Sequence, residues 1–107
     1  MSLTSLPQVA AVQALTHLHL AADRAEALAV GDIYSAWNAL AGQIRLVAGA
    51  IDPTVYPLQP PSTSSVHHCL TRAIDALNEA PAGPDVLIWI WHVSELRRLT
   101  DQLTTPP

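Results

Sequence analysis

The strongest constraint on the fold is a series of large apolar residues spaced alternately four and three positions apart. The series runs through residues 33–51 and consists of Ile33, Trp37, Leu40, Ile44, Val47 and Ile51. Because an α-helix turns by about 100° per residue, this spacing places all of these side chains on one face. The pattern therefore predicts a helix over residues 33–51 with one buried face, and it places Trp37 in the core.

Three other segments have helical periodicity and predict further helices near residues 6–30, 65–80 and 85–103. Between the first two helices, Gly31 supplies a stop and Asp32 a new N-cap. A kinked continuation of a single helix is also compatible with so short a join. The expected fold is all-α, a four-helix bundle that forms one domain over residues 1–107.

The segment 86–91 reads Val-Leu-Ile-Trp-Ile-Trp, a composition that is also compatible with a buried strand. A helix is favoured because Asp85 can cap it and because the pattern continues without a break into residues 94–103. There is also no second strand-like run with which this segment could pair.

A long proline-rich crossover is expected between the second and third helices. Residues 52–64 contain four prolines and no helical periodicity. A link of this length spans the bundle if the helices on either side of it run parallel, since a helix of 18 residues is about 27 Å long. Whether the crossover is only a connector stays open from the sequence.

The charges and the lengths of the apolar runs argue against two classes of partner, nucleic acids and membranes. The basic residues are five arginines, and nine acidic residues bring the formal net charge to −4. Only Arg97 and Arg98 are adjacent, whereas nucleic acids are bound by clustered cations. No apolar run approaches the roughly 20 residues that span a bilayer. We therefore expect neither a nucleic-acid partner nor a membrane.

Cys69 is the single cysteine and cannot form an intramolecular disulfide. The fold is therefore expected to depend on its core, as is usual in the reducing cytoplasm. The first residues lack the basic region of a secretory signal. These features predict a cytoplasmic protein, and the alanine-rich composition without lysine is typical of GC-rich bacterial or phage genomes.

Motifs for catalysis, cofactors and metals are weak. His67, His68 and Cys69 form the densest cluster of possible ligands, but adjacent helical residues point about 100° apart and cannot all face one ion. No paired-carboxylate or triad spacing occurs. We therefore expect no catalytic residues, no metal, no cofactor and no enzymatic activity.

The apolar first half of the last helix indicates an interaction protein. A helix that is apolar all round must be covered all round, and a small bundle covers only one side of it. We expect self-association, as a two-fold dimer, through Leu87, Ile90 and Trp91; another protein partner is also compatible with this surface. Alternatively, the crossover residues Val55, Tyr56 and Leu58 cover Trp91 within one chain.

A second hypothesis is a bundle that binds a small ligand or a metal through His92 and the tryptophans. His92 lies at the edge of the apolar face, beside Trp89 and Leu96, so Trp89 and His92 are candidates to line a ligand cavity. A core-edge histidine bonded to a carbonyl is the simpler interpretation of His92. The sequence does not distinguish these alternatives.

Overall fold

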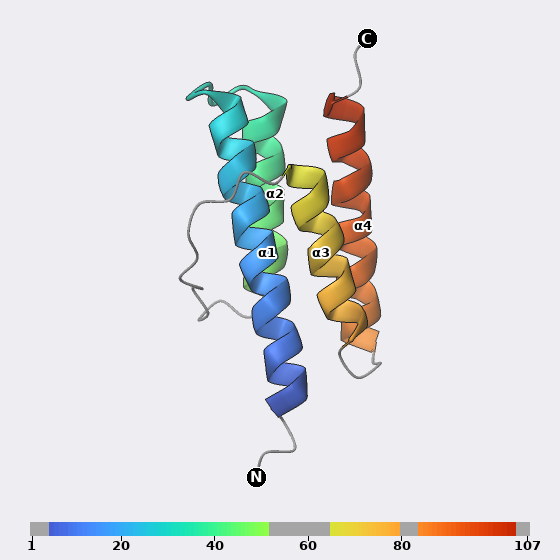
Figure 1. Ribbon diagram of the computed structural model, residues 1–107. Coiled ribbons are helices and arrows are strands. Elements are labelled where there is room, and N and C mark those ends of the chain that lie inside the picture. Colours follow the sequence, from blue (N-terminus) through green and yellow to red (C-terminus); the bar gives the residue numbers. More distant parts are fainter. Residues whose placement is uncertain (1–4, 52–64, 80–83, 105–107) are drawn as a thin grey trace.

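The chain folds into four α-helices and, within the described residues, no strand. The structure, a computed structural model, describes residues 5–51, 65–79 and 84–104. The helices are α1 (Ser5–Ala29), α2 (Ala36–Ile51), α3 (Val66–Asn78) and α4 (Pro84–Thr104) (Figure 1). The prediction of an all-α four-helix arrangement is confirmed, and residues 86–91 are helical.

Each helix packs against two of the other three. Helix α1 contacts α2 and α3, and α4 contacts the same two helices from the opposite corner. Neighbouring helices are antiparallel, while α2 and α3, which do not touch, run in the same direction (Figure 1). The end of α2 and the start of α3 therefore lie at opposite ends of the bundle, as a spanning crossover requires. The crossover itself, residues 52–64, lies outside the described residues.

The core combines small residues on α1 with larger ones on the other helices. Alanines on α1 let its neighbours approach closely, because a methyl group occupies little space between two helices. The fully or nearly fully buried side chains of the core include Ala14, Leu15, Leu18, Ala21, Ala22, Ala25, Leu40, Ile44, Leu70, Ala73, Leu77, Val93 and Leu96. Trp37 and Val47 are only partly buried and pack against this core.

The junction between α1 and α2 corrects the expected start of the second helix. Val30 and Gly31 adopt φ angles of 53° and 78°, in the left-handed region, which ends α1. The Asp32 carboxylate then accepts a bond from the Tyr34 backbone N–H at 2.9 Å, so this residue caps a turn and not a helix. Helix α2 begins only at Ala36. Ile33 is consequently 71% exposed, and its expected place in the buried face is wrong.

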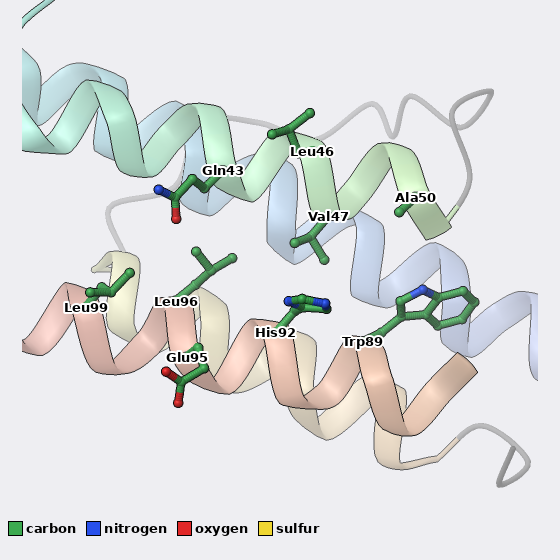
Figure 2. Close-up of a pocket in the computed structure, with 9 residues that line it drawn as sticks. All are labelled: Gln43, Leu46, Val47, Ala50, Trp89, His92, Glu95, Leu96 and Leu99. Atoms are coloured by element: carbon green, nitrogen blue, oxygen red, sulfur yellow. The ribbon is translucent and has the colours of Figure 1, made fainter. Parts of the chain in front are cut away.

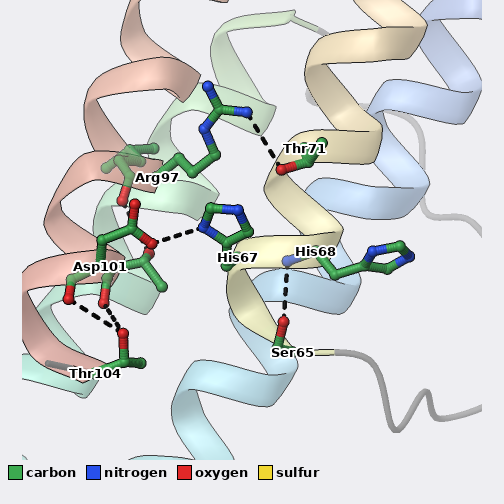
Figure 3. Close-up of polar contacts among 9 residues, drawn as sticks. Ser65, His67, His68, Thr71, Arg97, Asp101 and Thr104 are labelled. Atoms are coloured by element: carbon green, nitrogen blue, oxygen red, sulfur yellow. Dashed lines mark hydrogen bonds and ion pairs between the residues drawn. The ribbon is translucent and has the colours of Figure 1, made fainter.

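Ser35 and Ser65 supply the hydroxyl groups at two helix starts. Ser35 Oγ accepts a bond from the Trp37 N–H at 3.1 Å, and Ser65 Oγ accepts one from the His68 N–H at 3.1 Å (Figure 3). Each bond satisfies a backbone donor that has no partner inside its own helix. Ser65 is therefore the N-cap of α3.

Polar side chains link α3 to α4 at the surface. His67 Nδ1 lies 2.6 Å from Asp101 Oδ1, and Arg97 Nη1 donates to Thr71 Oγ1 at 3.3 Å (Figure 3). His67 and Asp101 are each about half exposed. Exposed pairs of this kind contribute about 0–1 kcal/mol each, so they add little to the stability of the α3–α4 contact.

Candidate functional site

A cavity lies between α2 and α4. Its volume is about 360 Å³, and it follows the edge at which these two antiparallel helices pack (Figure 2). Nine side chains line it: Gln43, Leu46, Val47 and Ala50 from α2, and Trp89, His92, Glu95, Leu96 and Leu99 from α4.

The walls of the pocket are mainly apolar, and its polar groups come from both helices. Leu96 is buried at its base, and Val47 and Trp89 are partly buried against the core. Figure 2 shows Gln43 extending from α2 toward α4, and His92 extending from α4 toward α2. The pocket thus presents an amide and an imidazole across an apolar floor.

Glu95 lies at the edge of the pocket and is already paired. Its side chain points away from α2 (Figure 2), and Oε1 accepts a bond from Arg98 Nη2 at 3.0 Å. The two residues are three positions apart on one helix face. The carboxylate charge at this edge is therefore partly balanced by an adjacent guanidinium.

An exposed apolar surface lies on the first half of α4, beside the pocket. It consists of Leu87, Ile88 and Trp91, which are 63%, 52% and 60% exposed. Ile90, expected from the sequence in this surface, is only partly exposed and packs against the core. Leu46, on the α2 side of the pocket, is 76% exposed.

Trp89 and His92, the two candidates for lining a ligand cavity, both line the pocket. Their partners on α2 were not identifiable from the sequence. Gln43, Leu46, Val47 and Ala50 are spaced by three, four and seven positions and so share one helix face, which is the available signal. That signal cannot reveal which helix this face meets.

Cys69, His67 and His68 do not come together as ligands of one metal ion. Cys69 is buried, and burial raises the pKa of its thiol, although the nearby Arg24 charge opposes the shift. A thiol in this environment is a poor nucleophile. No group of three or more His, Cys, Asp or Glu side chains in the described ranges is arranged to hold a metal ion.

His17 and His19 occupy partly buried positions on α1. Burial lowers the pKa of His17, and the positive charges of Arg72 and His68 lower it further. Burial and the Arg45 charge likewise lower the pKa of His19, with Asp23 acting in the opposite direction. Both histidines therefore favour the neutral form in the folded chain.

Arg45 joins α2 to α1 at the surface beside His19. Its guanidinium donates to Asp23 Oδ1 at 2.8 Å and also bonds to the Glu26 carboxylate. Burial would lower the pKa of Arg45, but the bonds to Glu26 and Asp23 outweigh it and raise the value. The cluster is therefore accounted for by its structural role at the α1–α2 edge.

Comparison with known proteins gives no relative: no family model, no curated protein and no solved structure matches this chain. None of the helices, over the residues described, is both long and apolar enough to cross a membrane. Function is therefore inferred from the geometry of the pocket and of the adjacent apolar surface.

Proposed function

We propose that this chain is a small non-catalytic interaction protein that self-associates through the exposed apolar surface of α4. The observation that carries the proposal is the exposure of Leu87, Ile88 and Trp91 on one stretch of helix. Full burial of side chains of this size is worth about 1.5–3 kcal/mol each. While these side chains remain exposed to water, most of this burial free energy is not gained. A partner that covers them would gain it on binding.

A second copy of the chain is the proposed cover. Two-fold assemblies are the commonest among soluble oligomers, and in them the same patch meets itself. The patch has the composition of such an interface, because an apolar centre is bordered by the charged pair of Glu95 and Arg98 one to two turns further along α4. Trp91 would act as the aromatic anchor, a residue type that is enriched among the side chains contributing most to binding.

Sedimentation equilibrium at micromolar concentration tests the proposal. A species of twice the 11.4 kDa chain mass is expected for the wild type. Ile88→Glu and Trp91→Glu should each return the chain to a monomer, with helicity by circular dichroism unchanged.

Ile33→Glu is the matched control for Ile88→Glu. Ile33 is also exposed, but it lies in the turn before α2 and outside the α4 surface. This variant should sediment as the wild type does. A monomer throughout the concentration range would refute self-association and favour coverage of Trp91 by residues 55–58 of the same chain. A dimer that persists in both α4 variants would place the interface elsewhere.

A further inference from the structure

The pocket between α2 and α4 has the size and lining of a small-molecule site. Its volume of about 360 Å³ lies within the range of about 300–1,000 Å³ that is common for such sites. Neighbouring helices normally interdigitate and leave few voids larger than a water molecule. Here Ala50 lies on the wall opposite α4, and its short side chain leaves space next to the Trp89 indole.

The hydrogen-bonding groups of the pocket favour an uncharged ligand. Gln43 and His92 extend into the space from opposite helices (Figure 2), and both side chain types can donate and accept hydrogen bonds. The nine residues that line the pocket include no arginine. Along the chain, Arg45 lies nearest to Gln43 and Arg97 lies nearest to His92. Arg45 is bonded to the carboxylates of Asp23 and Glu26, and Arg97 is bonded to Thr71. An anionic ligand would therefore meet the Glu95 carboxylate at the pocket edge without a cation dedicated to it.

We infer that the pocket binds a small, uncharged aromatic molecule that carries one hydrogen-bonding group. Its ring packs against Trp89, Val47 and Leu96, because aromatic rings gain from offset or edge-on contact with an indole beyond the burial of area. Its polar group bonds to His92. Neither Leu87 nor Trp91 lines the pocket, so this binding does not require the residues of the proposed self-association surface as contacts.

The probe for this inference is 2-naphthol, and its matched control is 2-naphthoate, which has the same rings but a carboxylate. Each is titrated into the ¹⁵N-labelled chain and followed by amide chemical shifts. Saturable shifts are expected for 2-naphthol at the amides of residues 43–50 and 89–99, and the affinity for 2-naphthoate should be at least tenfold lower. No saturable shift up to millimolar 2-naphthol, or equal affinity for both probes, would overturn the inference.

Two variants connect binding to the pocket itself. Ala50→Leu fills the space beside Trp89 and should weaken 2-naphthol binding at least tenfold, whereas Ala27→Leu, at an exposed position of α1, should not change it. His92→Phe should weaken 2-naphthol several-fold and leave naphthalene binding unchanged, because only the polar contact is lost. Binding that survives Ala50→Leu would place the probe elsewhere and refute the site.

Leu87→Glu separates this inference from the proposed self-association. The substitution alters the α4 apolar surface but no residue of the pocket. A monomeric Leu87→Glu chain that still binds 2-naphthol shows that the two properties are separate. Loss of binding in this monomer would show that the pocket needs the second copy and would overturn the inference as stated.

Discussion

The indole of Trp91 meets the imidazole of His92 nearly edge to face, with ring centroids 5.1 Å apart and ring planes inclined by 76°. The two residues are neighbours in the chain, and the helical rotation of about 100° directs them to different surfaces. His92 lines the pocket, while Trp91 is exposed on α4. The ring contact thus joins the proposed ligand site to the proposed self-association surface.

Replacing Trp91 with leucine should change the magnetic environment of the His92 ring. The variant keeps an apolar side chain but loses the edge-to-face contact, so the His92 ring proton shifts should move in an aromatic NMR spectrum. Leu87→Ala is the control, because it reduces the same apolar surface and keeps both rings of the Trp91–His92 contact. Unchanged His92 shifts in Trp91→Leu would contradict the ring contact.

Truncating Leu70 should be far more costly than truncating Leu46, although the chemical change is the same. Leu70 is completely buried in the core, whereas Leu46 is largely exposed. A buried Leu→Ala change lowers the free energy of unfolding by about 2–5 kcal/mol, while a surface change is usually within about 0.5 kcal/mol. Urea unfolding of Leu70→Ala and Leu46→Ala measures the two values.

Similar losses in these two variants would mean that Leu46 is covered in solution. Measuring the stability of Leu46→Ala at several protein concentrations then shows whether a second copy of the chain covers this residue. If Leu46→Ala loses stability only at protein concentrations where a second copy is bound, the interface extends across the pocket to α2, because association stabilises the folded chain by mass action.

The helical core was predictable from sequence because its signal is local. In α3, Val66, Leu70, Ala73 and Leu77 repeat at helical spacing, and all four are buried. The prediction that Ile33 lies in the buried face of the second helix was wrong, and the cause is equally local. Its spacing to Trp37 fits the helical series, but the left-handed backbone at Val30 and Gly31 and the Asp32 turn shift the helix start to Ala36.

The candidate site was only half predictable, because it depends on which helices are neighbours. Trp89 and His92 were identifiable from their place on the last helix. Their partners Val47 and Ala50 were not, since α2 meets α4 at an edge set by the packing of all four helices. Spacing within one segment carries no information about contacts between segments.

Trp37→Ala should lower the free energy of unfolding by about 2 kcal/mol. Truncation of a fully buried aromatic residue typically costs more, about 3–5 kcal/mol. The sequence places Trp37 in the core, and the indole packs against the core while remaining partly exposed. The loss of buried area is correspondingly smaller. Chemical denaturation measures the change. Alanine has a higher helix propensity than tryptophan, so the measured loss reports the lost packing and not a weaker helix.

The stability of the fold should fall on mild acidification, with His17 as one cause. Burial and the nearby charges of Arg72 and His68 lower the pKa of this imidazole in the folded chain, below the ordinary value of about 6.5 that holds in the unfolded chain. About one pH unit above that value the ring is largely neutral in both states, and its contribution to stability is nearly fully present. As the pH falls, the unfolded chain binds the proton first, so the free energy of unfolding decreases until the folded-state pKa is passed.

His17→Gln removes this titration and should therefore flatten the pH dependence. The loss of unfolding free energy between about pH 7.5 and about pH 5.5 should be smaller in this variant than in the wild type, as measured by urea unfolding at both pH values. His19, whose pKa is lowered in the same direction, continues to titrate, so part of the dependence should remain. Gln13→Ala, at an exposed and non-titrating position of α1, should follow the wild type. An identical pH dependence in His17→Gln and wild type would show that His17 gains its proton equally well in both states.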